Sequence, residues 1–267
     1  MACDPIMISD SSLSFAWAKA FREVMRHPIR RCPQLFVSID NPSFGLPSED
    51  SAIRTALDDT LKKNDCISCD VSAMTIFPHK LWQRHHSSPC DEFSKVCTSR
   101  LLPRMKALDQ RNRRGTYFER LMAYKGVRNG KECEINQLDE VIQRLNGKKH
   151  FRATGLQMTC FNPALDHSPQ PRLGFPCLQH VGVTFEGKTE IVVTGYYPSQ
   201  HIFSRAYGNY LGLAHLGSFL CDQTGLNLSR IVCIATHPLL GCSAKMPLKG
   251  LMMKIENRLE EREYDGE

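Results

Sequence analysis

The sequence predicts a single α/β domain, and one stretch in its C-terminal half carries most of that prediction. Residues 178–185 alternate in polarity, residues 186–188 read Glu-Gly-Lys, and residues 189–196 are rich in β-branched and aromatic side chains. This order predicts two paired strands joined by a tight turn. Apolar residues then recur at helical spacing over residues 207–221, and an apolar run at residues 231–235 predicts a further strand.

The same periodicities place elements elsewhere in the chain. Residues 13–26 form an apolar helical face that Ser11 and Ser12 can cap and that Pro28 ends. Gly225 is expected to end the helix that begins at residue 207. The remaining expected elements are helices at residues 51–63 and 136–145 and strands at residues 35–39 and 156–161.

Length and composition favour one soluble domain that spans residues 1–267. Apolar residues make up 42% of the chain, enough to bury a single core, and the net charge of +6 comes from scattered basic residues. That charge suits a phosphorylated small molecule, and its scatter argues against a nucleic acid partner. No run of 18 apolar residues and no leader-like segment occurs, which predicts a cytoplasmic protein without a membrane partner. The twelve scattered cysteines indicate reduced thiols.

One cluster of cysteines and histidines has some features of a metal site. It consists of Cys66, Cys69, His85, His86, Cys90 and Cys97. A zinc site usually draws its ligands from two local pairs, and the second pair here lacks suitable spacing. Cysteine is also an ordinary buried residue in reduced proteins. We therefore expect no bound metal, with zinc at Cys66 and Cys69 as the alternative.

The central stretch follows an order that is known from one enzyme family. It runs from Pro176-Cys177 through the predicted hairpin to a corner at residues 196–201, then to Asn209 and to a strand that ends in Thr236-His237. This order resembles the thymidylate synthase family, which includes the pyrimidine hydroxymethylases. The resemblance is strongest over residues 113–240, and the N-terminal third diverges. It implies a mixed, strongly twisted sheet with helices on one face and a buried central helix.

The chain also departs from that family at informative positions. The phosphate-binding arginine of the corner is replaced by Pro198, the corner aspartate by His201, and a tyrosine that follows the strand by Leu239. These departures indicate a divergent member with an altered substrate.

The resemblance implies catalytic roles for Cys177, Tyr117 and Asn209. A cysteine thiolate that adds to carbon 6 of a pyrimidine makes carbon 5 nucleophilic, so Cys177 would attack, Tyr117 would handle a proton and Asn209 would read the base. A free thiol has a pKa of about 8.5 and is mostly protonated at neutral pH, so positive charge must activate it. The candidates for that charge are His180, His201, Arg205 and Arg172.

Four further residues are expected to bind the nucleotide. By resemblance, Ser199 and His201 belong to the phosphate-binding corner, His237 contacts the sugar, and Arg152 reaches the phosphate bound by the other subunit of a homodimer. Ordinary alternatives are a turn serine, a structural histidine and a surface arginine. The resemblance also implies a pyrimidine nucleotide as substrate and 5,10-methylenetetrahydrofolate as cofactor.

Two functions remain open from the sequence. The first is a transferase that adds a one-carbon unit to carbon 5 of a pyrimidine nucleotide through a Cys177 adduct. The alternative is a nucleotide-sensing or scaffold protein that kept this fold and lost turnover, because a buried cysteine and a helical asparagine could be retained for packing alone.

Overall fold

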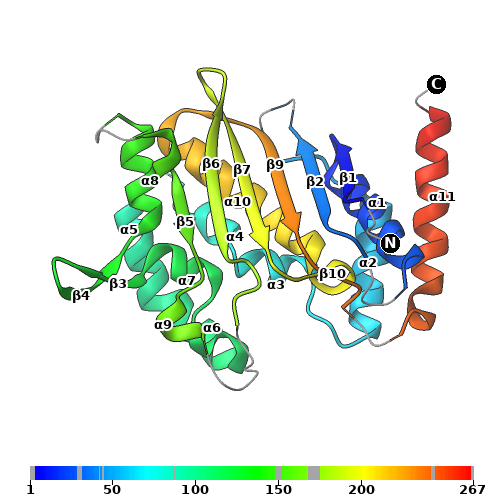
Figure 1. The fold of residues 1–267 in the computed structure, drawn as a ribbon, viewed down its shortest axis with the longest axis horizontal. Coiled ribbons are helices and arrows are strands. Elements are labelled where there is room, and N and C mark those ends of the chain that lie inside the picture. The colour runs from blue at the N-terminus through cyan, green and yellow to red at the C-terminus, as the bar shows by residue number, and fades with distance from the viewer. Residues whose placement is uncertain are drawn as a thin grey trace.

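A six-stranded mixed sheet forms the centre of the protein in this computed structural model (Figure 1). The structure describes residues 4–265 except residues 29–31, 42, 44, 87, 148–151, 168–174 and 242–243. The strand order is β1-β2-β9-β7-β6-β5, with parallel pairs β1–β2 and β7–β9 and antiparallel pairs elsewhere. The strands are β1 (Ile6–Asp10), β2 (Leu35–Asp40), β5 (Gln157–Thr159), β6 (His180–Glu186), β7 (Glu190–Tyr197) and β9 (Asn227–Ala235). The predicted α/β class and mixed sheet are confirmed.

Strands β6 and β7 form the predicted hairpin. Gly187 has φ +76°, a left-handed value that a glycine adopts without steric cost, so it allows the tight turn. Val183 lies opposite Val193, and both side chains are fully buried. The alternation of polarity along β6 therefore reports which side chains point toward the core.

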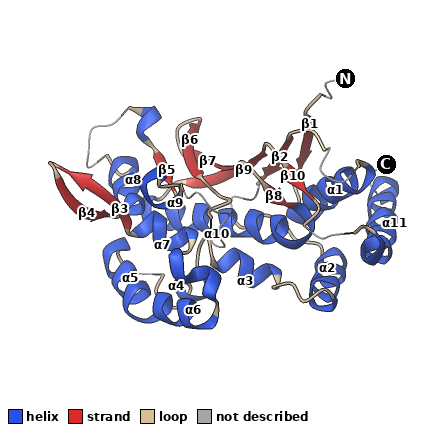
Figure 2. Ribbon diagram, turned by 60° about the horizontal axis from the view of Figure 1, so that its bottom comes forward, coloured by secondary structure: helices blue, strands red, loops and turns tan. Residues whose placement is uncertain are grey.

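The helices pack mainly against one face of this sheet, where Figure 2 shows α1, α3 and α10. Their bounds are α1 (Leu13–Arg26), α2 (Ser51–Lys63), α3 (Cys69–Met74), α4 (His79–Trp82), α5 (Cys90–Val96), α6 (Leu102–Leu108), α7 (Tyr117–Met122), α8 (Gln137–Leu145), α9 (Pro163–Asp166), α10 (Tyr207–Thr224) and α11 (Lys249–Asp265). π-Helical turns occur at Cys97–Leu101 and Ile202–Ala206, and 3-10 turns at Gln110–Arg114, Ala153–Gly155 and Met246–Leu248. None of the helices described is long and apolar enough to cross a membrane.

Two small strand pairs lie outside the main sheet. β3 (Tyr124–Arg128) and β4 (Lys131–Ile135) form an antiparallel hairpin that projects from the body in Figure 1. β8 (Gln200–His201) and β10 (Pro238–Leu239) pair in parallel next to the ends of β7 and β9. The second pair builds the corner that the sequence analysis singled out.

Helix α10 runs through the centre of the molecule, as predicted. Its apolar residues are distributed around the whole helix, and such a helix is stable only when it is buried on most sides. Gly208 and Gly212 let α3 approach closely: a Cβ at residue 208 would stand 2.4 Å from the Ser72 Cβ, and one at residue 212 would stand 2.9 Å from the Ala73 carbonyl oxygen. Gly225, with φ +71°, ends the helix as expected.

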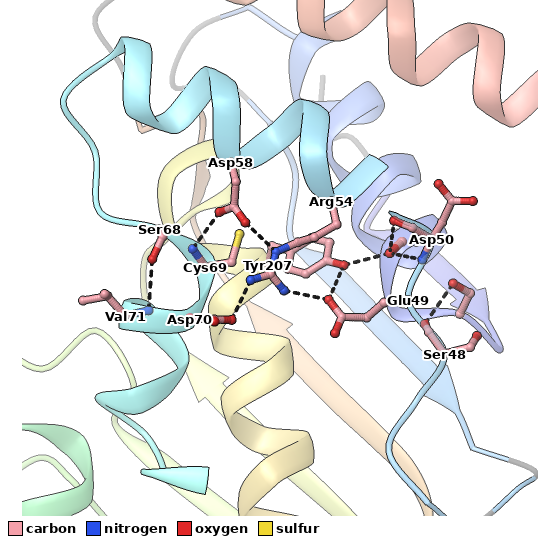
Figure 3. A network of polar contacts seen from close by, with 12 residues as sticks. Ser48, Glu49, Asp50, Arg54, Asp58, Ser68, Cys69, Asp70, Val71 and Tyr207 are labelled. Atoms are coloured by element: carbon pink, nitrogen blue, oxygen red, sulfur yellow. Dashed lines mark hydrogen bonds and ion pairs between the residues drawn. The ribbon is translucent and has the colours of Figure 1, made fainter. Parts of the chain in front are cut away.

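A network around Arg54 holds the beginning of α10 against α2 and α3 (Figure 3). The Arg54 guanidinium donates to Glu49 at 2.8 Å, to Asp58 at 2.7 Å and to Asp70 at 2.6 Å. The Tyr207 hydroxyl, in the first turn of α10, donates to Glu49 at 2.7 Å. Because the network is shared by three helices, it fixes the point at which the central helix leaves the corner.

The N-terminal third belongs to the same sheet and core as the rest of the described chain. β2 pairs with β9 along its whole length, and the core extends from Ile8 to Leu259. One detail of the prediction was wrong: Ser12 occupies the cap position of α1, but its side chain donates to the Ser48 carbonyl at 3.1 Å instead of accepting from the helix. The tertiary contact replaces the local cap.

Candidate functional site

The candidate site lies at one end of the sheet, where parallel strands β7 and β9 both finish. β6 runs antiparallel to β7, so the segment that precedes β6 arrives at the same end. The Gln179 amide donates to the Tyr196 carbonyl at 3.0 Å and fixes this arrival. Cys177, two residues earlier, therefore lies beside the ends of β7 and β9.

The corner after β7 is joined to the segment after β9 by hydrogen bonds. The Thr236 hydroxyl donates to the Pro198 carbonyl at 2.9 Å, and the Gln200 amide donates to the His237 carbonyl at 3.2 Å. His201 lies opposite Leu239 in the same parallel pair. The structure thus brings together two motifs that lie more than 30 positions apart in the chain.

Gly241 allows this junction to close. Its φ is +89°, and a Cβ there would stand 2.6 Å from the Ser204 Oγ and 2.8 Å from the His201 Cβ. A side chain at this position would push the segment after β10 away from the π-helical turn Ile202–Ala206. The sequence shows this glycine without indicating what it contacts.

Cys177 is exposed and has two polar neighbours from other elements. The side chain of Tyr117, at the start of α7, lies close enough to the Cys177 thiol that each group affects the pKa of the other. Arg205, from the π-helical turn that leads into α10, acts on the thiol as a positive charge. Side chains from three separate segments therefore influence the charge state of this sulfur.

The groups around Cys177 shift the pKa of its thiol in opposite directions. Partial burial raises the pKa of the thiol, whereas the Tyr117 hydroxyl and the Arg205 charge lower it, and the net pKa is above its ordinary value. Burial also raises the pKa of Tyr117, so its hydroxyl is a proton donor near pH 7. The resting pair is thus a thiol beside a neutral tyrosine, with a cation near enough to favour the thiolate.

Asn209 lies on the buried side of the first turn of α10, only 5% exposed. Among the described residues, nothing forms a hydrogen bond with its carboxamide. Several other polar groups of the described core are enclosed without a partner, namely the hydroxyls of Tyr197 and Tyr210 and both carboxamide atoms of Gln200. Buried polar groups are usually paired, so bound water is expected in this interior.

The three predicted nucleotide contacts of the corner lie close together. Ser199 is half-buried and precedes β8, while His201 and His237 are exposed on the paired segments of β8 and β10. Partial burial, followed by the Arg205 charge, lowers the pKa of His201, so its imidazole is neutral near pH 7. A neutral imidazole can donate or accept a hydrogen bond but brings no charge to the site.

Arg152 does not lie with Ser199, His201 and His237 in the same chain. Arg152 is exposed before the 3-10 turn Ala153–Gly155, and its guanidinium pairs with no described residue. Lys148, Lys149 and Arg172 lie outside the described residues. His180 faces the sheet surface, where its Nε2 lies 2.7 Å from the Gln157 Oε1. Of the four residues considered as activators, Arg205 and His201 are the ones placed at the corner.

The cysteine and histidine cluster does not assemble into a metal site in the part of the chain that the structure describes. No group of three or more His, Cys, Asp or Glu side chains is positioned to hold an ion there. Cys69 is buried on α3, and burial raises the pKa of Cys90 on α5 to about 12. Thiols of this kind are protonated and make poor ligands.

The geometry predicts how Cys177 responds to alkylation. Its rate of reaction with iodoacetamide should rise with pH as the thiolate forms, and Arg205→Ala should move this profile about one pH unit higher because the thiolate loses a nearby charge. Arg205→Lys should restore part of the shift, and Tyr117→Phe should also move the profile upward. Peptide mass spectrometry measures each site separately.

Cys133, half-buried on β4, is the internal control because it reports on the reagent in the same sample. Cys177 is the one exposed cysteine among the ten that the structure describes. Unchanged Cys177 profiles in both the Arg205→Ala and Tyr117→Phe proteins would show that neither residue influences the thiol.

Comparison with known proteins does not assign this chain to a family. No protein-family model matches it, and no curated protein matches it.

Proposed function

We propose that this protein is a divergent, cytoplasmic thymidylate synthase-like transferase. It adds a one-carbon unit to carbon 5 of a pyrimidine nucleotide, with 5,10-methylenetetrahydrofolate as donor. The observation that carries the proposal is the meeting of Cys177, Tyr117 and Arg205 at one end of the sheet. A nucleophile, a proton donor and a positive charge are the groups that this chemistry requires.

In the proposed reaction, the Cys177 thiolate adds to carbon 6 of the ring, and carbon 5 then attacks the one-carbon donor. Loss of the proton on carbon 5 then expels tetrahydrofolate and leaves an exocyclic methylene on the ring. The sulfur departs as that methylene takes up water, which gives a hydroxymethyl group, or a hydride from tetrahydrofolate, which gives a methyl group. Arg205 favours the thiolate, since a positive charge nearby lowers the pKa of a thiol. It would take the part of the family arginine that Pro198 replaces. Tyr117 holds a proton next to the sulfur and returns it as the adduct breaks.

The remaining predicted residues would position the nucleotide. The carboxamide of Asn209, which no described group occupies, both donates and accepts and so matches the edge of a uracil ring better than a carboxylate would. Ser199, His201 and His237 would contact the sugar and phosphate at the corner. Arg152 would act from the partner subunit, because in its own chain it is not part of the cluster.

The decisive experiment uses a pyrimidine whose carbon 5 cannot release a proton. The protein is incubated with 5-fluoro-dUMP or 5-fluoro-UMP and methylenetetrahydrofolate, and its mass is then measured. We expect a stable adduct of the nucleotide and the one-carbon donor on Cys177. Saturable nucleotide binding without any adduct would favour the alternative function over the transferase.

That alternative is a catalytically inactive nucleotide-sensing or scaffold protein on the same fold. It is favoured by the raised pKa of Cys177, which leaves the resting thiol mostly protonated, and by the loss of the guanidinium at Pro198. The transferase and a nucleotide sensor both predict nucleotide binding at the same corner. They differ in whether Cys177 forms a covalent bond.

We further propose that the protein is a homodimer joined through the open face of the sheet. A row of side chains crosses that face in register: Met7, Phe36, Ile234 and Tyr196. Met7 is 73% exposed, and the face is bordered by the ion pairs of Arg230 with Asp40 at 2.6 Å and with Glu186 at 3.0 Å. An apolar centre with a charged border is typical of an interface.

Light scattering at micromolar concentration tests this interface. We expect the mass of a dimer for the unmodified protein and of a monomer for Ile234→Lys, because the lysine charge would be buried at the centre of the contact. Met253→Lys is the control, since Met253 is also apolar and exposed, at 61%, but lies on α11 away from this face. A monomer mass for the unmodified protein contradicts the proposal.

A further inference from the structure

A pocket lies away from the corner, beneath the projecting β3–β4 hairpin. It has a volume of about 270 Å³ and is formed by the 3-10 turn Gln110–Arg114 and by parts of α6, α7, β3 and α9. Gly115, with φ +95°, turns the chain from the 3-10 turn into α7 and forms part of the lining. Its lining is rich in basic side chains.

Each acid in this lining has a cationic partner, although the Glu119 Oε2 is enclosed without a hydrogen bond. Arg120 binds Asp166 through two hydrogen bonds of 2.6 and 2.8 Å, and its remaining donors bind the carbonyls of Cys160 and Arg114. Lys106 binds the Glu119 Oε1 at 2.6 Å. Each of these two pairs has no net charge. The net charge of the pocket therefore comes from the other basic side chains in its lining.

Arg113, Arg114 and Lys125 line the same pocket and pair with no acidic side chain among the described residues. The lining therefore carries five cations and two carboxylates, a net charge of +3. Guanidinium groups bind phosphate through two parallel hydrogen bonds, and two of the three unpaired cations are arginines. Leu165, 53% exposed, adds an apolar wall on which a carrier group can rest.

We propose that this pocket binds the phosphate group of a small phosphorylated metabolite. The volume accommodates one phosphate group attached to a molecule about the size of a sugar. Such a ligand is smaller than a typical drug molecule. Arg113 and Arg114 hold the phosphate, and Lys125 closes the opposite side. Because the three cations are at the surface, salt weakens the binding.

This site is separate from the corner that contains Cys177. Arg120 contacts the carbonyl of Cys160 from the pocket side, whereas the Cys160 thiol points toward the carbonyl of Tyr117. The Cys160 segment and α7 thus stand between the two sites. The proposal does not depend on the transferase function, because it uses none of the residues assigned to that reaction.

Isothermal titration calorimetry at low ionic strength tests the site, with ribose 5-phosphate as the probe and ribose as its uncharged counterpart. We expect saturable binding of ribose 5-phosphate and none of ribose. The double variant Arg113→Ala, Arg114→Ala should weaken binding at least about tenfold, since each arginine supplies charge-assisted hydrogen bonds. Arg104→Ala, an exposed arginine of α6 outside the pocket, should leave the affinity unchanged.

A second control separates the pocket from the corner. The variant Ser199→Ala, His237→Ala removes a proposed phosphate contact and a proposed sugar contact at the corner and should keep the affinity for ribose 5-phosphate. Equal affinity of the double arginine variant and the unmodified protein would overturn the proposal. So would an equal loss in Arg104→Ala, which would indicate nonspecific attraction, or the absence of saturable binding to the unmodified protein.

Discussion

Cys177→Ser should abolish the covalent adduct with fluorinated nucleotide and lower turnover by a factor of about a thousand or more, equivalent to about 4 kcal/mol. The reason is that a serine hydroxyl is far less ionised than a thiol near neutral pH and is a weaker nucleophile at a ring carbon. Adduct formation is measured by intact-protein mass and turnover by chromatography of the nucleotide product.

The same substitution should leave folding almost unchanged. Cys177 is exposed as a residue although its thiol is partly enclosed, and serine is nearly the same size, so the free energy of unfolding should change by no more than about 0.5 kcal/mol. Cys133→Ser is the matched control, because Cys133 is a half-buried cysteine on the projecting hairpin and should keep full activity. Full activity of Cys177→Ser would reduce Cys177 to a structural thiol.

Asp166→Ala should give the largest loss of stability among single side-chain changes, about 3 to 5 kcal/mol. Asp166 is 3% and Arg120 10% exposed at the side chain, and their bonds are bidentate, so the substitution leaves a guanidinium buried without its counter-charge. Asp166 also accepts from the Asn162 amide at 2.8 Å and so fixes α9. Urea unfolding at pH 7 measures the loss.

Two further variants make this prediction specific. Arg128→Ala removes the exposed half of the Arg128–Glu140 pair, whose arginine is 57% exposed, and should cost less than about 1 kcal/mol. The double variant Arg120→Met, Asp166→Leu should be more stable than Asp166→Ala, because no unpaired charge remains buried. Equal destabilisation by Arg128→Ala and Asp166→Ala would show that burial does not control the strength of these pairs.

Elements with strong local signals were predicted from the sequence with nearly the right bounds. The alternation over residues 178–185 and the Glu-Gly-Lys turn predicted β6 and β7, and the helix at residues 13–26 coincides with α1. Strand β1 was missed because only five residues form it, and its parallel pairing with β2 depends on a partner that lies beyond α1. The pair β8–β10 was missed for the same reason, whereas the local β3–β4 hairpin was missed although residues 129–130 read Asn-Gly, a typical hairpin turn.

The candidate site was predictable in its residue types but not in its assembly. Pro176-Cys177, Asn209 and Thr236-His237 stand out along the chain, and Tyr117 was expected to handle a proton. Which cation serves Cys177 could not be chosen, because Arg205 lies 28 positions away and reaches the thiol only through the π-helical turn that follows the corner. The basic pocket under the β3–β4 hairpin was not predicted, because its basic residues appear in the sequence only as scattered charges.

The sequence by itself determined which segments form the hairpin, that α10 is buried, and which residues can carry thiol chemistry. These properties depend on periodicity, turn residues and side-chain chemistry, which act over a few positions. The tertiary structure alone decided that Tyr117, Cys177 and Arg205 meet, that Ser12 bonds to Ser48 instead of its helix, and that unpaired cations gather around one pocket. Such contacts join segments distant in sequence, and their positions depend on the strand order and on how closely the helices pack.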